Sequence, residues 1–378
     1  MGRLLALLVL SAGCGFSSPA ASSQVSDAAQ GSDGAPCVPG FLDLCNQTAQ
    51  STSLNFTSAK MLDTDRDQLC HRISQPGGGE VCLVYATVIN ITSTGSITAF
   101  GSRPLVLASS STMTIDGTID VGSHAGPNGG QRGPGANAMT GCTFAGNPAD
   151  DSGGGGGGAG GSFTLPGGDG GTGDNDNSSP PTGTAAAGLH GATTTISVLR
   201  GGCAGQTGGD ESTMFGSGRG GRGGSSGGAL YLFARQSLTI TGNVRATGAG
   251  GGGGDVQAGG GGGGSGGLVV IESPSITISG QISANGGGGG QGGGRISGND
   301  FSGNPGTDGN LGATAAAGGS GAASGDQRLG FGGAGGALSA AVNGTTEDFG
   351  AGGGGGAAGA IKLLGQQQVS GAISPAPQ

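Results

Sequence analysis

Five copies of one short pattern recur far apart in this chain, and they constrain its fold more than any other feature. The clearest copy, Leu105–Val121, opens with an apolar run. A second run starts eight residues after Leu105, and there every second position is apolar or, at Gly117, glycine. A period of two is typical of a β-strand that buries one face. The other copies start at Val81, Leu230, Leu268 and Ile361.

One copy cannot bury its apolar row alone, so the copies are expected to stack around a shared dry interior. Ile115, Ile240 and Ile278 occupy the same position in three copies and should meet there. The in-phase glycines, such as Gly117 and Gly242, are predicted to adopt φ > 0 and to form a corner between two short strands.

These features predict an all-β fold, a right-handed parallel β-helix or solenoid with long Gly-rich insert loops. The alternative is an antiparallel β-sandwich with Gly-rich loops, because several short strands joined by Gly-rich turns also favour that architecture. The fixed eight-residue offset between the two runs favours the solenoid. The predicted solenoid covers residues 81–378, with one large insert at 122–228 that includes a predicted strand at Thr193–Leu199.

Glycine dominates the composition, with 97 glycines among 378 residues, and tryptophan is absent. The glycine runs have two open interpretations: flexible loops, or extended three-fold helices that lie side by side and bond to one another. A largely disordered glycine-rich chain is a third reading of the whole protein. The net charge of −9, without a basic cluster, argues against nucleic-acid binding.

The N-terminus predicts a secretory signal over residues 1–13. Arg3 precedes the apolar run Leu4–Leu10, and small residues precede Cys14. This end resembles the lipobox of bacterial lipoproteins, in which the cysteine is acylated and becomes the first mature residue. The departure is that Leu10 lies four residues before Cys14 rather than three. A plain signal peptide with a coincidental cysteine is the alternative.

Residues 14–36, rich in Ser, Ala, Gln and Asp, are predicted to be the lipidated cysteine and a flexible tether. Residues 37–80 are predicted to form a disulfide-stapled cap over the end of the solenoid. Six cysteines remain after Cys14, and sequence proximity pairs them as Cys37–Cys45, Cys70–Cys82 and Cys142–Cys203.

Two sets of acidic residues are candidate sites. Asp63, Asp65 and Asp67 alternate within the cap and could present carboxylates to calcium, although Gln68 and Ser74 replace the EF-hand glycine and glutamate. The alternative is a solvated acidic turn, and no other cofactor is predicted. Outward-facing Asp116 and Asp120, with Arg245 on the next coil, could do acid–base work on a sugar. The histidines His71, His124 and His190 match no catalytic motif and are predicted to lie on the surface.

The chain resembles the glycine-rich surface lipoproteins of myxobacteria and their relatives, some labelled PE-PGRS-like, although no PE domain is present. The lipobox, the segment Cys37–Cys45 and the unit Gly101–Leu107 carry this resemblance. It implies an outer-membrane lipoprotein of a Gram-negative bacterium, on the surface or periplasmic face. The predicted function is a non-enzymatic structural or adhesive protein whose partners are the membrane, through the lipid, and an extracellular polysaccharide or another cell surface. The alternative function is a polysaccharide-active β-helix lyase or hydrolase.

Overall fold

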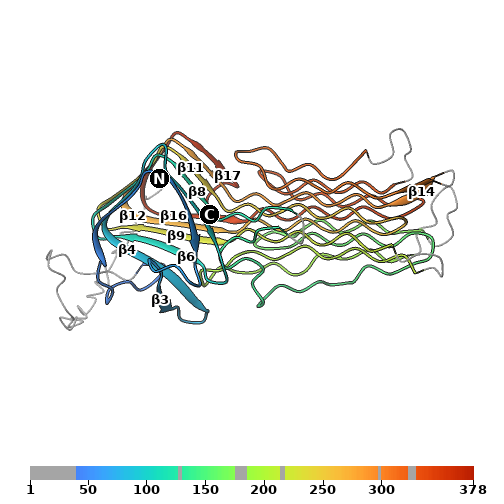
Figure 1. Ribbon diagram of the computed structural model, residues 1–378, viewed down its shortest axis with the longest axis horizontal. Helices are drawn as coiled ribbons and strands as arrows, with labels where there is room; N and C mark the ends of the chain where they lie inside the picture. Colours follow the sequence, from blue (N-terminus) through green and yellow to red (C-terminus); the bar gives the residue numbers. More distant parts are fainter. Residues whose placement is uncertain (1–39, 127–129, 175–184, 213–217, 297–298, 322–328) are drawn as a thin grey trace, which may run out of the picture. The chain divides into compact units, whose positions relative to one another are not determined.

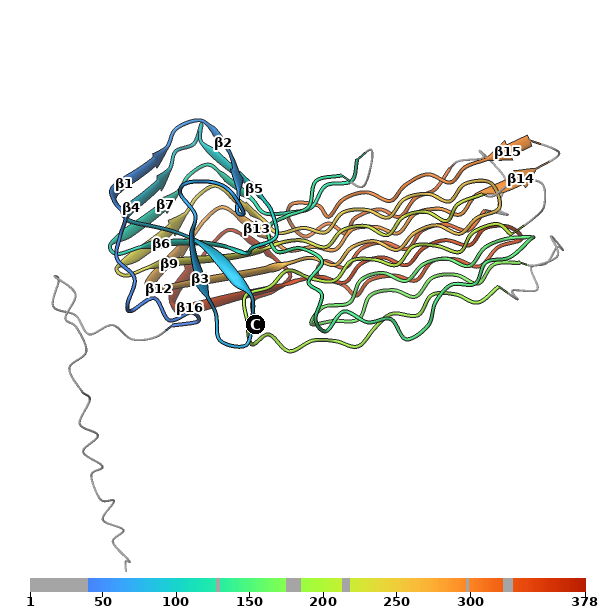
Figure 2. The same ribbon diagram turned by 60° about the horizontal axis from the view of Figure 1, so that its bottom comes forward.

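The computed structural model describes residues 40–126, 130–174, 185–212, 218–296, 299–321 and 329–378, and its regular elements are all β-strands (Figures 1 and 2). The first eight strands are β1 (Ser51–Phe56), β2 (Ala59–Asp63), β3 (His71–Ser74), β4 (Glu80–Ile91), β5 (Ser96–Phe100), β6 (Leu105–Ser109), β7 (Thr112–Ile115) and β8 (Thr118–Asp120). The later strands are β9 (Ala229–Ala234), β10 (Ser237–Ile240), β11 (Asn243–Arg245), β12 (Leu268–Ile278), β13 (Gln281–Ser283), β14 (Gly294–Ile296), β15 (Asn299–Phe301), β16 (Ala360–Val369) and β17 (Ala372–Ser374).

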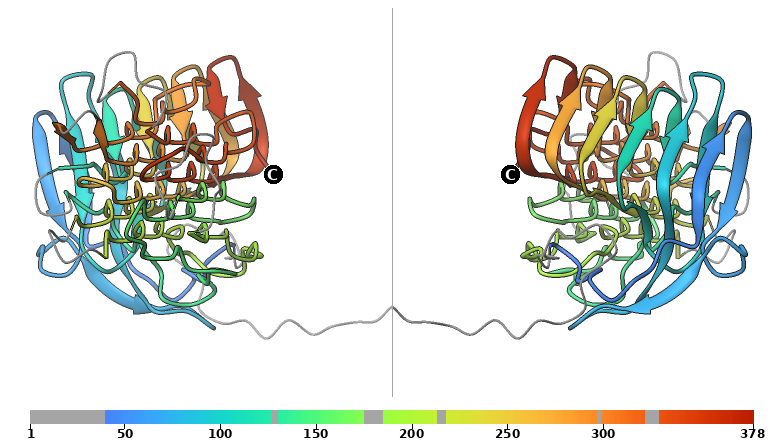
Figure 3. Two further views of the ribbon diagram at one scale, coloured as in Figure 1. Left: turned by 90° about the vertical axis from the view of Figure 1, so that its right-hand side faces the viewer. Right: turned by 90° about the vertical axis from the view of Figure 1, so that its left-hand side faces the viewer.

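Strands that carry the same part of the sequence pattern lie side by side, parallel and in register (Figure 3). β7 pairs with β10, and β10 pairs with β12, so that Ile115, Ile240 and Ile278 are direct neighbours across the sheet. β8, β11 and β13 pair in the same way in a second sheet. The repeated pattern therefore places equivalent residues on top of one another.

The pairings overturn the predicted right-handed β-helix. In the main sheet β4 pairs with both β6 and β7, and β12 pairs with both β9 and β10, so six parallel strands close into a ring in the order β4-β6-β9-β12-β10-β7. A separate six-stranded parallel sheet has the order β17-β13-β11-β8-β5-β2. The long strands β4 and β12 cause the closure, because each spans positions that two shorter strands fill elsewhere. The antiparallel sandwich is also wrong, since the pairings within both sheets are parallel except for β3 against β4.

The predicted shared interior is confirmed. Ile115, Ile240 and Ile278 are each 0% exposed and belong to one hydrophobic core, together with the apolar residues of β8, β11 and β13. Burying an isoleucine side chain contributes about 1.5–3 kcal/mol, so the stacked rows supply much of the stability of the strand body.

The first apolar run of two copies has a different phase from the prediction. Cys82 and Val269, rather than Val81 and Leu268, align with Leu105 and Leu230 and face the shared core. The pairing of β12 with β16 also shifts register between Glu272 and Ser275. In these first runs the strands are apolar on both faces, and their outward residues form a second core. Apolar and polar residues therefore do not alternate in them, and the sequence could not show which residues face inward.

Residues 40–80, the described part of the cap predicted over 37–80, supply β1 and β2 at the edges of the two sheets and β3 as an antiparallel partner of β4. Leu42 and Leu44 cover the outward face of the main sheet as part of the second core. The carboxylate of Glu272 in β12 holds this segment, because it accepts hydrogen bonds from the Phe41 N–H and the Tyr231 hydroxyl, each at 2.8 Å.

The corner glycines are required for a different reason from the one predicted. Gly117, Gly242 and Gly280 do not have φ in the left-handed region. Instead, a Cβ on Gly242 would collide with the carbonyl oxygen of Gly117, and one on Gly280 with that of Gly242. Each glycine therefore permits the next layer of chain to approach the layer before it.

The glycine runs form an ordered bundle, which confirms the second interpretation of them. The N–H groups of Gly158 and Gly161 donate to the carbonyl oxygens of Gly260 and Gly263, each at 2.9 Å, so the bonds repeat every three residues. A three-residue step is that of the extended polyproline II-type helix. Figures 1 and 2 show these segments side by side, continuing away from the strands. The predicted strand at Thr193–Leu199 is wrong, since no strand forms there.

One segment, 258–267, lies at the centre of this bundle. Its backbone bonds to six neighbouring segments: 155–161, 203–209, 221–227, 246–252, 287–293 and 351–357. Because three residues make one turn, every third residue forms its hydrogen bonds with the same neighbouring segment. Residues of the large insert and of the segments beside later strands thus become one hydrogen-bonded body.

Candidate functional site

The candidate functional site is the glycine bundle together with its junction to the strands. At the junction His124 lies between Asp120 of β8 and Asp308 of the bundle. Its Nε2 is 3.1 Å from an Asp120 carboxylate oxygen, and its Nδ1 is 3.5 Å from one of Asp308. The other Asp308 oxygen accepts hydrogen bonds from the Ala125 N–H at 2.9 Å and the Gly250 N–H at 3.0 Å. The three side chains therefore tie a strand to two segments outside the sheets.

The two carboxylates change the charge state of this histidine. Hydrogen bonds to Asp120 and then Asp308 raise the pKa of His124 to about 9, against the opposing effect of its burial. Burial acts to raise the pKa of Asp120 and of Asp308. Hydrogen bonds and nearby positive charge outweigh burial, the hydrogen bond from His124 most of all, so the pKa of each carboxyl lies below its ordinary value. Arg245, which pairs with Asp120 across the sheet, adds a further favourable charge. The cluster is ionised on all three members at neutral pH.

The junction predicts a pH dependence of stability. Because the pKa of His124 is raised on folding, its contribution is fully present below pH 6.5 and is lost as the pH rises through about 9. We expect His124→Gln to lower the free energy of unfolding by about 1.5 kcal/mol near pH 6 and by much less above pH 9. Urea unfolding of both proteins across this range measures the difference. A difference that stays constant with pH would contradict the charged-histidine assignment.

The two aspartates predicted for acid–base work are not brought together as a pair. The corner at Gly117 separates them, so Asp120 belongs to β8 in the second sheet, whereas Asp116 lies between β7 and β8. Asp116 accepts a hydrogen bond from the Thr241 hydroxyl at 2.7 Å, in the layer above it. Both carboxylates thus have structural partners.

The three aspartates predicted for calcium lie at the end of β2 (Asp63) and in the turn that follows it (Asp65 and Asp67), and each has its own partner. Asp63 accepts the Asp65 N–H at 2.9 Å, and Asp67 forms an ion pair with Lys60 at 2.6 Å. Asp65 accepts the Ser102 hydroxyl at 2.7 Å and pairs with Arg103 at 2.9 Å. Within the described ranges, no group of three or more His, Cys, Asp or Glu side chains is placed to hold a metal ion. Calcium binding by this turn has no geometric support and stays a prediction.

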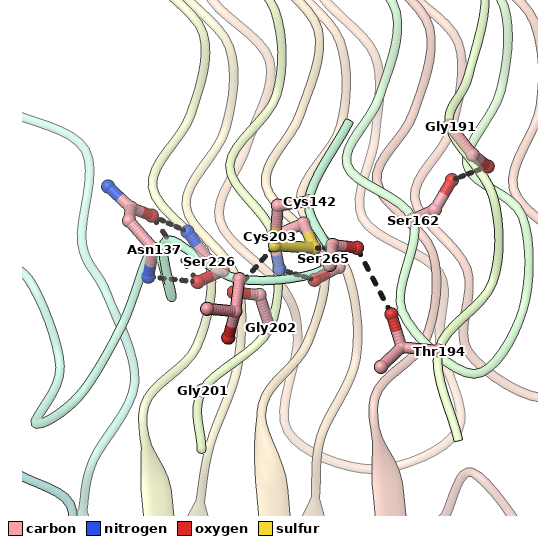
Figure 4. The surroundings of a disulfide bond; sticks show 12 residues. Asn137, Cys142, Ser162, Gly191, Thr194, Gly201, Gly202, Cys203, Ser226 and Ser265 are labelled. Carbon is pink, nitrogen blue, oxygen red and sulfur yellow. Dashed lines mark hydrogen bonds between the residues drawn. A yellow bond between two sulfur atoms is a disulfide. The ribbon is translucent and has the colours of Figure 1, made fainter. Parts of the chain in front are cut away.

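Two of the three predicted disulfides lie wholly within the described residues, and both are formed. Cys70–Cys82 joins the turn after β2 to β4, and Cys142–Cys203 lies within the bundle. Cys45 is disulfide-bonded, but Cys37 and the predicted lipidation site Cys14 lie outside the described residues. Figure 4 shows Cys142–Cys203 beside Ser265, whose hydroxyl accepts the Cys203 N–H at 2.9 Å.

A buried arginine supports the second disulfide, and the sequence patterns did not single it out. Arg200 donates to the Thr140 carbonyl oxygen, lies 3.0 Å from the Cys142 sulfur, and stacks over the Phe163 ring at 5.7 Å. Burial lowers its pKa. Asp308 was also missed. Neither residue belongs to a repeat or a motif, so nothing in the sequence marked them.

The strand body and the bundle also enclose an open cleft of about 520 Å³, lined by the turn at Gly77–Gly79, by Gly135–Thr140 and by two arginines. Arg103 is paired with Asp65 and Glu80, each at 2.9 Å, and Arg200 is held as described above. Both guanidinium groups therefore stabilise the protein itself.

No family model matches the chain, and no curated protein or solved structure is similar to it. Within the part of the chain that the structure describes, no helix is long and apolar enough to cross a membrane.

Proposed function

We propose that this chain is a non-enzymatic, lipid-anchored surface protein of a Gram-negative bacterium with a structural or adhesive role. The observation that supports it is the glycine bundle, in which the central segment 258–267 is bonded through its backbone to six other segments. A run of glycines left as a loop would keep its large conformational entropy and transmit no force. A bundle with every third residue bonded to a neighbour is a stiff body that can carry a load.

The surface of the bundle carries polar side chains in rows with the same three-residue step. Asp169 and Thr172 on one segment face Asn343 and Thr346 on the next, with N–H bonds to the Asn343 and Thr346 side chains at 2.8 and 3.0 Å. Hydroxyl, amide and carboxylate groups in regular rows suit hydrated partners, and we propose an extracellular polysaccharide or another cell surface as the partner. The same rows cover backbone donors that would otherwise be open.

The proposed anchor is a lipid on Cys14, at the outer membrane. We expect cells fed radiolabelled palmitate to label the wild-type chain and not Cys14→Ser, because only a thiol at this position takes part in lipoprotein acylation. Ser17→Ala, a change in the adjacent tether, should leave the label unchanged. Equal labelling of Cys14→Ser and wild type would remove the anchor from the proposal.

The adhesive role is tested separately from the anchor. Cells that carry the wild-type chain, lack it, or produce Cys14→Ser are compared for attachment to polysaccharide-coated surfaces and to one another. The proposal expects reduced attachment in the latter two strains. Undiminished attachment in the deletion strain on all surfaces would overturn the adhesive role and leave a structural one, which changes in envelope integrity would report.

A further inference from the structure

The bundle carries an open groove of about 570 Å³ on its surface, next to the junction with the strands. Its floor is the segment Ala249–Gly253. One wall is the segment Arg219–Ser225, and Pro305 belongs to the other wall. The floor segment bonds to both walls, since the Gly252 N–H donates to the Arg222 carbonyl oxygen at 2.8 Å and the Gly306 N–H donates to the Gly251 carbonyl oxygen at 2.9 Å.

The packing of the bundle shows what kind of surface this is. The central segment 258–267 bonds to six neighbours, whereas the floor segment bonds to four: 219–225, 258–264, 285–291 and 303–309. In a three-fold helix, successive residues point to three sides in turn. Two sides of the floor segment bond to these four neighbours. The third side, formed by Gly250 and Gly253, lines the groove. The groove therefore lies where the floor segment has fewer neighbouring segments than the central segment has.

Open backbone groups lie along this groove. The Gly250 N–H is covered by the Asp308 carboxylate at 3.0 Å. The Gly253 N–H and C=O have no hydrogen-bond partner among the described residues, and neither do the N–H groups of Arg222 and Gly223 on the wall. The side chains of Arg219 and Arg222 are exposed at the same wall, three residues apart, and guanidinium groups only donate.

We propose that this groove binds a glycine-rich segment of another polypeptide, extended with three residues per turn, as one further member of the bundle. Such a segment rises about 3.1 Å per residue and offers N–H and C=O groups at the spacing of Gly250 and Gly253. Its free carbonyl oxygens suit the arginine donors. Within the bundle a Cβ on Gly250 or Gly253 would collide with the carbonyl oxygens of Gly306 and Gly303, so neighbouring segments approach more closely than side chains allow, and a further segment packed in the same way would be glycine-rich. The inference is independent of the lipid anchor and of attachment to polysaccharide.

The test uses a fluorescein-labelled peptide with the sequence of residues 259–267, GGGGGGSGG, and fluorescence anisotropy with the whole protein. Saturable binding is expected. A nine-residue proline peptide has a similar extended shape but no N–H groups, and it should bind at least tenfold more weakly. Absence of saturable binding, or equal binding of the two peptides, would overturn the proposal.

A variant within the groove locates the binding. Gly252 is the glycine of the floor with the most room for a Cβ, because the nearest atom would be the Arg222 nitrogen at 3.1 Å, a tight contact that a small shift relieves. Gly252→Leu should fill the groove and weaken peptide binding at least tenfold, while Gly252→Ala should change it less than threefold. Thermal unfolding confirms that both variants are folded. Unchanged binding by a folded Gly252→Leu protein would show that another surface binds the peptide. Displacement of the peptide by inorganic phosphate would show that the groove is a simple anion site. Either result would overturn the proposal.

Discussion

Gly262→Ala should unfold the glycine bundle and lower the free energy of unfolding by about 3 kcal/mol or more. Gly262 lies in the central segment, and a Cβ there would collide with the carbonyl oxygen and carbon of Ala159. The backbone of Ala159 cannot retreat easily, because its carbonyl oxygen accepts the Gln206 N–H at 2.8 Å. Relief of the clash must therefore separate segments and break their shared rows of hydrogen bonds. Circular dichroism and urea unfolding measure the loss.

Two other glycine-to-alanine changes are matched controls. At Gly252, in the bundle but on its surface, the nearest atom to a new Cβ is the Arg222 nitrogen at 3.1 Å. At Gly79, in the turn between β3 and β4, a new Cβ meets nothing within 4 Å. Both should change stability by less than about 1 kcal/mol, with the loss of glycine entropy in the unfolded chain offsetting part of any cost. If Gly262→Ala were as stable as these two, close backbone packing would not be what holds the bundle.

Removal of the Cys142–Cys203 disulfide, as the double variant Cys142→Ala and Cys203→Ala, should cost about 4 kcal/mol. The bridge closes a loop with a sequence separation of 61 residues, in a region where glycine gives the unfolded chain unusual freedom. The double variant also removes the contact of the buried Arg200 side chain with the Cys142 sulfur, at 3.0 Å. Thermal or urea unfolding under non-reducing conditions gives the difference.

The matched control is the double variant that removes Cys70–Cys82, whose sequence separation is 12. A shorter loop restricts the unfolded chain less, so a loss of about 3 kcal/mol is expected there. The ordering of the two losses is the critical result. A larger loss from Cys70–Cys82 would mean that contacts in the folded state, rather than the freedom of the glycine-rich chain, decide what each bridge contributes.

Order in the bundle depends on a balance that favours folding only when many segments assemble together. Fixing the backbone of one residue costs about 1–2 kcal/mol, and glycine lies at the expensive end. A backbone hydrogen bond returns about 0.5–1.5 kcal/mol and is shared by two residues, so a residue offsets most of that cost only when both its N–H and its C=O are bonded. The central segment meets this condition: the Gly261 N–H donates to Gly252, and its carbonyl oxygen accepts from Gly290. Glycine alone permits the required approach on all sides.

The sequence by itself determined which residues face a common interior in the alternating second runs of the pattern, but not in the uniformly apolar first runs. Alternation of apolar and polar residues leaves one arrangement in which Ile115, Ile240 and Ile278 are all dry, and they are. It also placed the glycines that allow layers to touch, although the reason is close approach rather than left-handed φ. Proximity along the chain was enough for Cys70–Cys82, because its partners are 12 residues apart.

Only the tertiary structure decided how the sheets close and which glycine segments are neighbours. Ring closure depends on β4 and β12 running through two strand positions, and their uniformly apolar first halves carry no period that reveals it. Six consecutive glycines, Gly259–Gly264, have no side chain to distinguish one neighbour from another, and their N–H and C=O groups bond equally well to any extended chain. The positions where strands and the disulfide Cys142–Cys203 hold the ends of these segments select the neighbours. The pairing of His124 with Asp308 follows from that selection, since it joins residues that no local pattern connects.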